Sequence, residues 1–168
     1  MLKKIALLVV LFALPLGAMA QKFAHMNSQE VIVAMPEYTK AQADLDAMSK
    51  QYQEEMQRSQ TEFNKKVQEF QQQADSLPKN IAERRQKELQ DMAQRQEEFQ
   101  QDAYQNMQKA QQDALVPIYK KLDEAIQAVG KAEGVIYIFD LARTSIPYVN
   151  ESQSINLTSK VKANLGIK

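Results

Sequence analysis

The sequence contains no cysteine and no tryptophan, only one histidine, and few glycines and prolines, 4 and 5 respectively in 168 residues. Without cysteine there is neither a disulfide framework nor a thiol nucleophile, although exported chains of this size often depend on disulfides. Stability must therefore come from packing or from assembly with other chains. There is also no glycine-rich phosphate loop and no serine beside a histidine and an acid. These absences argue against an enzyme and against a cofactor.

The lone histidine, His25, has no neighbouring ligands that would make a zinc site, so we expect no metal. A hydrogen-bonded, partly buried histidine is the favoured interpretation, and a pH sensor is the alternative. Asp140, which follows an apolar run, is similarly interpreted as capping a turn rather than as a catalytic acid.

A long hydrophobic run occurs only in residues 1–20, MLKKIALLVVLFALPLGAMA. Two lysines, an apolar stretch and the small residues Ala18-Met19-Ala20 form the pattern of a secretory signal peptide. Its apolar core of about twelve residues is shorter than the roughly 20 needed to span a bilayer, which favours cleavage over an N-terminal anchor. We expect a mature chain that begins near Gln21 and resides in the periplasm of a Gram-negative bacterium.

The charges are nearly balanced, with 21 Lys and Arg against 21 Asp and Glu. Removing Lys3 and Lys4 with the signal peptide leaves 19 against 21, a slight acidic excess. Proteins that bind nucleic acid normally carry a basic excess, so no nucleic-acid partner is expected.

Two long stripes of apolar residues occupy the middle of the chain. From Tyr38 to Leu77 they recur at steps of three and four, with a polar gap at Ser59, and a second stripe runs from Ile81 to Val129. This spacing predicts two coiled-coil-like helices, near 36–75 and 80–129, about 60 and 75 Å long. The second stripe has polar gaps at Arg85 and Gln96. Rods of this length do not fit a compact domain, so we expect an antiparallel hairpin over 37–129.

The expected tip of the hairpin lies near 75–80. Pro78 disfavours helix at Leu77, and Asn80 with Glu83 resembles a capping box that starts the second helix. The tripeptide Asp75-Ser76-Leu77 resembles an acceptor for periplasmic O-glycosylation at Ser76, although three residues often match by chance. Pro117 predicts a kink in the second helix, with a helix end as the alternative, and is a candidate hinge.

After Gly130 the pattern changes to Val135-Ile136-Tyr137-Ile138-Phe139, which predicts a strand largely buried on both faces. Residues 146–149 predict an edge strand, and residues 22–27 a third strand. A final helix is expected over 157–165, capped by Asn156 and stopped by Gly166.

The fold class is therefore α+β, predominantly α, with a β-rich body from 21–36 and 130–168 and the hairpin projecting from it. Three strands make a poor core with open edges, so we expect copies of the chain to associate.

The whole chain resembles the Skp, or OmpH-like, family of periplasmic chaperones. The resemblance rests on a first strand ending in asparagine (23–27), a short helix before Pro36, the two polar helices, VGKAEGVIYIFD at 129–140, Tyr148, and Asn156-Leu157-Thr158-Ser159-Lys160-Val161. It implies a jellyfish-shaped homotrimer whose hairpins surround a cavity. Unfolded outer-membrane proteins are held there without ATP and passed to the outer-membrane assembly machinery.

Adaptable methionine and aromatic side chains on the hairpin are the candidates for client binding: Tyr52, Met56, Phe63, Phe70, Leu77, Phe99, Tyr104 and Met107. Most of them lie on the stripe that must also close the hairpin, so hairpin packing competes with client contact, but Tyr104 lies off the stripe. The candidates for oligomerisation and the body core are Phe23, Met26, Val135, Ile136, Ile138, Phe139 and Tyr148.

One expected feature of the family is missing. Where the resemblance implies an arginine cluster on the second helix, this chain reads Gln108-Lys109-Ala110-Gln111, and the basic residues near the tip alternate with acidic ones. Binding of lipopolysaccharide or anionic lipid is therefore left open. A structural coiled-coil spacer or stalk of the envelope is the alternative function, but the polar gaps and alanines of the stripes favour flexible arms.

Overall fold

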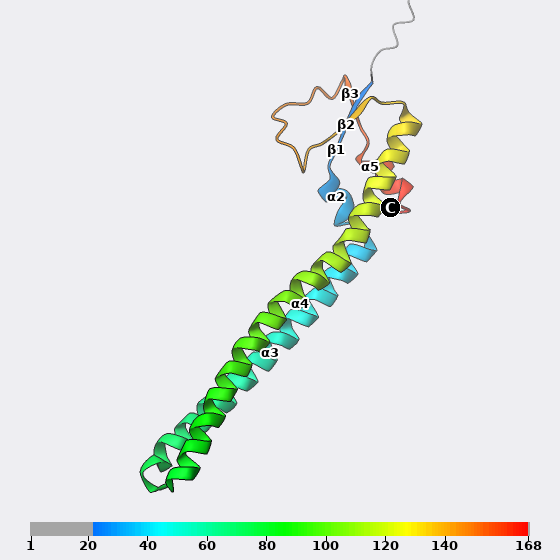
Figure 1. The fold of residues 1–168 in the computed structure, drawn as a ribbon. Helices are drawn as coiled ribbons and strands as arrows, with labels where there is room; N and C mark the ends of the chain where they lie inside the picture. Colours follow the sequence, from blue (N-terminus) through cyan, green and yellow to red (C-terminus); the bar gives the residue numbers. More distant parts are fainter. Residues whose placement is uncertain (1–21, 168) are drawn as a thin grey trace, which may run out of the picture.

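The computed structural model describes residues 22–167, and it consists of a small body and one long helical projection (Figure 1). The predicted signal peptide lies outside the described residues. Helices α3 (Pro36–Gln73) and α4 (Lys79–Glu133) run antiparallel and form the projection, which we call the arm. The α+β fold and the long hairpin predicted from the stripes are confirmed.

The tip of the arm differs in detail from the prediction. A short 3₁₀ turn, η1 (Ala74–Ser76), ends α3, and α4 begins at Lys79 directly after Pro78. The Pro78 carbonyl accepts hydrogen bonds from the backbone N–H groups of Ile81 and Ala82, at 2.9 and 3.0 Å. The predicted cap at Asn80 is therefore wrong, because Pro78 starts the helix and Asn80 lies inside its first turn.

Helix α4 continues through Pro117, so the alternative of a helix end there is wrong. It also continues past Gly130 and ends at Gly134, whose φ of 63° places it in the left-handed conformation that glycine adopts without strain. Gly130 has a different role, because a Cβ atom at this position would lie 3.0 Å from Ile138 Cδ1. The missing side chain lets the helix approach the sheet closely.

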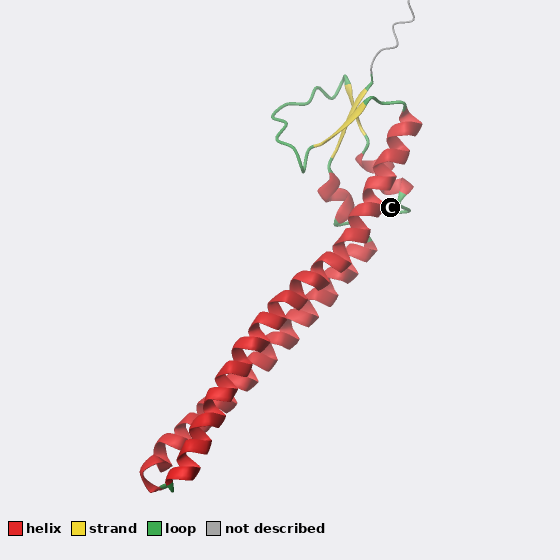
Figure 2. Ribbon diagram, in the orientation of Figure 1, coloured by secondary structure: helices red, strands yellow, loops and turns green. Residues whose placement is uncertain are grey.

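The body contains a three-stranded parallel sheet in the order β2-β1-β3, formed by β1 (Phe23–Met26), β2 (Tyr137–Asp140) and β3 (Ser154–Asn156). The strand from the N-terminal segment is thus central, and the two strands after the arm form the edges. Figure 2 shows α4 and α5 on one side of the sheet and the loop between β2 and β3 on the other, with α2 below the end of β1.

Two strand predictions are wrong. The segment 146–149 forms no strand and belongs to the loop 141–153, because both sides of β1 are already paired, by β2 and by residues 154–156. Pro147 could not donate to a ladder in any case. Strand β2 is also not buried on both faces, since Tyr137 and Phe139 are exposed while Ile138 between them is half-buried.

The core lies between the sheet and the helices. Helix α2 (Ser28–Ile32), capped by the Asn27 side chain, and helix α5 (Thr158–Asn164) pack with α4 against Ala24 and Met26. Leu122 of α4 is fully buried at the centre of this cluster. Gly166, with φ 74°, follows the end of α5, as predicted. The predicted cap at Asn156 is wrong, because α5 begins one residue later than expected and Leu157 is its N-cap; Asn156 still accepts a hydrogen bond from Thr158 N at 3.0 Å.

Asp140 caps the turn after β2, as expected. Its Oδ1 accepts hydrogen bonds from the backbone N–H groups of Ser28 and Ala142, both at 3.1 Å. Its buried Oδ2 has no aligned hydrogen-bond donor, but Arg143 Nε lies 3.4 Å away, within ion-pair range. Arg143 also lies over the Tyr119 ring, 5.4 Å from its centroid, and so ties the loop 141–153 to α4.

Candidate functional site

The seam between α3 and α4 is apolar but incompletely closed. Tyr52 of α3 and Phe99 of α4 meet edge to face, with ring centroids 5.8 Å apart. Both rings remain half-buried, and Ala41, Met92 and Ala103 are the side chains that the seam buries most deeply. Apolar side chains along the arm are therefore reachable from solvent even when the hairpin is closed.

The polar residues that interrupt the two stripes form hydrogen bonds across the seam. Gln96 Nε2 donates to Ser59 Oγ at 3.0 Å, and Arg85 donates to Gln73 Oε1 at 2.7 Å. Between these two layers Lys66 bonds Glu88. The hydrogen bond between Lys66 and Glu88 lowers the pKa of the Glu88 carboxyl and raises the pKa of the Lys66 amine. The outer half of the arm is thus joined partly by polar contacts, which are weaker than a continuous apolar seam.

The candidate client-binding residues are spread along the arm and do not form one cluster. Tyr52, Phe63, Phe70, Leu77, Phe99 and Met107 are half-buried, as hairpin packing requires. Met56 is 38% exposed and Tyr104 is 65% exposed, and Tyr104 accepts a hydrogen bond from Gln108. Ser76 lies in η1 at the tip, where its hydroxyl donates to the Gln73 carbonyl.

A second apolar surface covers the face of the sheet that points away from the helices. We call it the outer face; Phe23, Tyr137 and Phe139 lie on it, with the Tyr137 and Phe139 rings 6.2 Å apart. His25 also lies here, nearly buried, and its Nδ1 is 2.8 Å from Ser154 Oγ. The outer face and the loop 141–153 enclose a hollow of about 330 Å³.

The predicted body residues divide between the core and exposed positions. Met26 is fully buried, and Val135 and Ile138 pack against the core. Phe23, Ile136, Phe139 and Tyr148 are instead exposed, with Tyr148 at 76%. Tyr137, at 61% exposure, belongs to the same surface but was not among the predicted residues, although its place between Ile136 and Ile138 indicates it.

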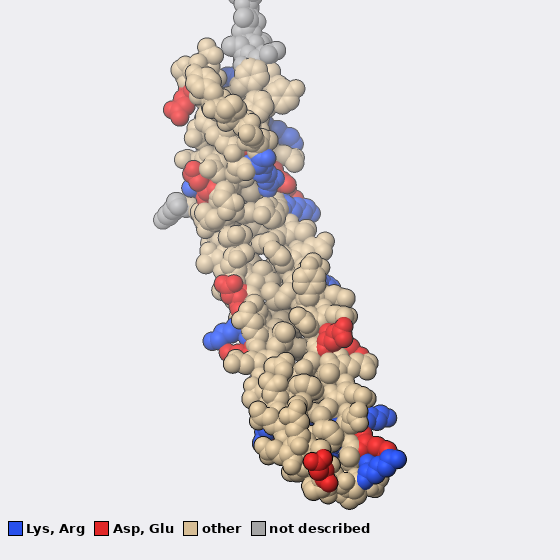
Figure 3. Space-filling view, turned by 90° about the vertical axis from the view of Figure 1, so that its left-hand side faces the viewer, with Lys and Arg blue, Asp and Glu red and all other residues tan. Residues whose placement is uncertain are grey.

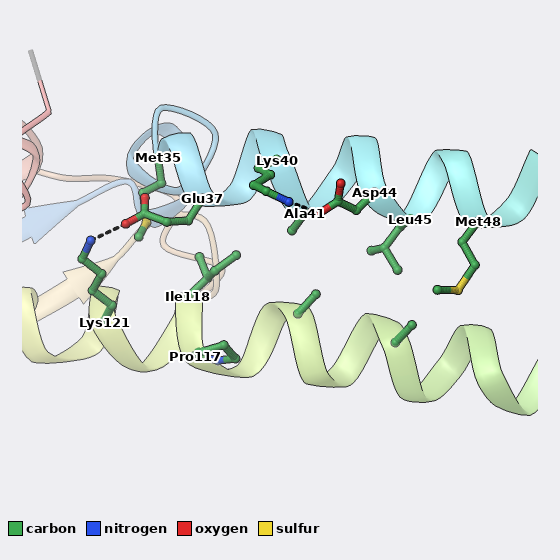
Figure 4. A pocket seen from close by; sticks show the side chains of 12 residues that line it. Met35, Glu37, Lys40, Ala41, Asp44, Leu45, Met48, Pro117, Ile118 and Lys121 are labelled. Atoms are coloured by element: carbon green, nitrogen blue, oxygen red, sulfur yellow. Dashed lines mark hydrogen bonds and ion pairs between the residues drawn. The ribbon is translucent and has the colours of Figure 1, made fainter.

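A third apolar surface is a groove of about 410 Å³ at the base of the arm, which we call the basal groove. Figure 4 shows side chains of α3 and α4 pointing into the space between the two helices. The apolar lining consists of Met35, Ala41, Leu45, Met48, Ala110, Ala114, Pro117 and Ile118, and the charged lining of Glu37, Lys40, Asp44 and Lys121. This groove was not predicted from the sequence, and the alanines within the apolar stripes are the signal that indicates it.

The charges of the arm are mixed and largely paired. Lys109, in the segment where an arginine cluster was expected, bonds Asp113 at 2.7 Å, which raises the pKa of the lysine. Lys65 and Lys79 near the tip lie 3.9 Å from Glu69 and Glu83. On the face drawn in Figure 3, positive and negative side chains are interspersed. These pairs give the arm no basic patch of the kind that would attract an anionic surface.

Neither a helix able to span a membrane nor a metal-binding cluster occurs within residues 22–167. None of the helices that these residues form combines the length and the apolarity needed to cross a bilayer. The same residues include no group of three or more His, Cys, Asp or Glu side chains placed to hold a metal ion.

Comparison with known proteins identifies the family to which this chain belongs. Residues 22–165 match the family model described as outer membrane protein (OmpH-like). The chain belongs to the OmpH-like family. Its fold is similar to the crystal structure of an OmpH-like protein from Caulobacter crescentus that carries the name of an outer membrane chaperone. The TM-score is 0.74 at 19% identity, over 86% of this chain and 83% of that one. No curated protein matches the chain.

Proposed function

We propose that this chain is a periplasmic, ATP-independent holding chaperone for unfolded outer-membrane proteins. It binds them between helical arms, prevents their aggregation and releases them to the outer-membrane assembly machinery. The chain acts by binding and not by catalysis, and its membership of the OmpH-like family supports this class of function.

The observation that carries the proposal is the arm itself. Its two helices stand clear of the body over most of their length, and apolar side chains along the seam stay half-exposed. An unfolded barrel strand alternates apolar and polar side chains and presents unpaired edges. Scattered, weak apolar contacts next to paired charges suit such a client, because they bind without fixing one conformation.

One arm alone cannot enclose a client, so further copies of the chain are needed. The apolar outer face supports such an association. An exposed cluster of Phe23, Tyr137 and Phe139 beside the open edges of β2 and β3 is unfavourable in a lone chain. We propose that three copies join through these surfaces and the loop that carries Tyr148, with the three arms extending in the same direction around a cavity.

The test is the refolding of an outer-membrane barrel diluted from urea, followed by light scattering. The chain at three protomers per barrel should suppress most of the scattering. A variant with the outer arm removed between Phe63 and Phe99, shown by circular dichroism to be folded, should suppress much less. If the intact, folded chain leaves the scattering unchanged, the proposed function is wrong.

A structural stalk or spacer is the second candidate, supported by the continuous helices of the arm. A stalk requires a strong seam over its whole length. The polar layers Ser59–Gln96 and Gln73–Arg85 interrupt the seam in the outer half of the arm, which favours an arm that opens. Full suppression of scattering by the intact chain, lost on shortening the arm, would exclude a purely structural role.

A further inference from the structure

We propose that the basal groove binds an aromatic side chain of an unfolded polypeptide. This inference deepens the proposed function and rests on it, because it names the part of the arm where a client side chain is anchored most firmly. The other candidates for client contact are spread along the arm, and only Tyr52 and Phe99 among them form an aromatic pair, whereas the groove brings apolar groups from both helices together in one concave site.

The groove exists because small side chains face one another where the seam needs large ones. Ala41 of α3 and Ala110 and Ala114 of α4 line it. At the body end, the larger side chains of Met35 and Ile118 are buried in the core, so we infer that they set the spacing of the two helices there. The helices therefore cannot close onto the alanines without disrupting the body. The volume of about 410 Å³ lies within the usual range of about 300 to 1,000 Å³ for ligand pockets.

The walls of the groove suit an aromatic ring. Leu45, Ile118 and the ring of Pro117 provide apolar surface, and Met48 provides a flexible thioether. Methionine adapts its shape to different partners, and its sulfur makes favourable contacts with aromatic rings. A wall of this kind accepts several aromatic side chains without being specific for one sequence, as a chaperone of many clients requires.

The rim of the groove indicates a polypeptide. Lys40 is paired with Asp44, and Lys121 with Glu37, so the rim carries two positive and two negative charges and no excess of either sign. A charged ligand gains nothing from it. A peptide backbone that passes over the groove can instead use these groups as hydrogen-bond donors and acceptors while its side chain enters the apolar floor.

A second copy of the chain is a poorer occupant. The proposed contact between copies uses the outer face and the loop 141–153, and the basal groove shares no lining residue with the hollow there. A lipid acyl chain fits the apolar floor but has no use for a rim of paired charges. The experiment below distinguishes both of these occupants from a peptide side chain.

The experiment uses the absence of tryptophan from the chain, which makes a tryptophan-containing peptide the only source of tryptophan emission. The probe is a ten-residue peptide that alternates polar and apolar residues, with one central tryptophan. Titrating it with the full chain should give a saturable blue shift at one peptide per protomer. Ala114→Leu, which fills the groove, should weaken binding about tenfold or more, since it excludes a ring that buries most of its surface.

The matched control is Ala47→Leu, the same change at an exposed position of α3 that does not line the groove, and it should leave binding unchanged. Ala110→Leu is a second filling variant, in case Ala114→Leu does not fold by circular dichroism. Unchanged peptide affinity in a folded filling variant overturns the proposal. Binding of lysolipid, but not of the peptide, by the wild-type chain also overturns it, because the occupant would then be an acyl chain. An altered oligomeric state of a folded filling variant overturns it too, because the occupant would then be a second copy of the chain.

The outcomes also separate this inference from the proposed function. If the wild-type chain suppresses barrel aggregation but the filling variants bind the peptide normally, the inference is wrong and the function stands. If the chain binds the peptide in the groove but does not suppress aggregation, the site stands and the proposed function is wrong.

Discussion

Replacing the polar layer of Ser59 and Gln96 with leucines should stiffen the arm. The double variant Ser59→Leu with Gln96→Leu removes the 3.0 Å hydrogen bond across the seam and continues the apolar stripe through this level. Both positions are half-buried between α3 and α4, so two leucines pack there against each other and against neighbouring apolar side chains. The substitution therefore tests whether the polar layer keeps the arm weakly closed.

The magnitude follows from burial. A fully buried leucine contributes about 1.5 to 3 kcal/mol, so two half-buried leucines contribute about that amount together. Loss of one hydrogen bond costs about 1 kcal/mol. The free energy of arm opening should therefore rise by a net amount of about 0.5 to 2 kcal/mol, which corresponds to roughly a 2- to 30-fold smaller open population.

Hydrogen exchange of the backbone amides in the outer arm measures this population, and exchange should slow by about the same factor. The stiffened arm should also suppress barrel aggregation less well than the wild type. Gln53→Leu with Gln100→Leu, at exposed positions of the same two helices, is the control and should change neither property. Unchanged or faster exchange in the Ser59 and Gln96 double variant would refute the reasoning.

Three further predictions concern the body and its junction with the arm. Gly130→Ala should destabilise the chain by about 1 kcal/mol, because overpacking against Ile138 outweighs the gain in helix propensity, and adding Ile138→Val should restore stability in urea unfolding. Leu122→Ala, in the centre of the core, should cost about 2 to 5 kcal/mol in the same assay, and a loss below 1 kcal/mol would contradict the described core. The hydrogen bond from Lys121 lowers the pKa of Glu37, so this pair should stabilise the fold above the unfolded pKa of about 4.3, and the contribution should disappear as pH falls through the folded value. Since both side chains are about half exposed, Glu37→Gln should cost less than about 1 kcal/mol at pH 7 and nothing near pH 3, as thermal melts at the two pH values would show.

The features that sequence predicts well here are those encoded by local periodicity. The two stripes determine the long helices, and Gly166 adopts the positive φ that its position after the last helix predicts. Even the gaps are informative, because Ser59 and Gln96 interrupt separate stripes and then satisfy each other. Such pairing is visible only once the register between the helices is known.

The errors arise where partners distant in sequence decide the structure. The segment 146–149 has the composition of a strand, but residues 154–156 pair with β1 in its place. Tyr137 lies within an apolar run of the sequence yet is exposed, because the helices cover only one face of the three-stranded sheet. The basal groove depends on alanines of α3 and α4 that lie about 70 residues apart and meet only across the closed hairpin.

The proposed holding function can be measured by sedimentation of the chain with a fluorescently labelled, urea-diluted outer-membrane barrel. We expect one soluble species that contains three copies of the chain and one unfolded barrel, formed without ATP. A labelled barrel that sediments as aggregate while the chain remains a separate, unbound species would contradict it.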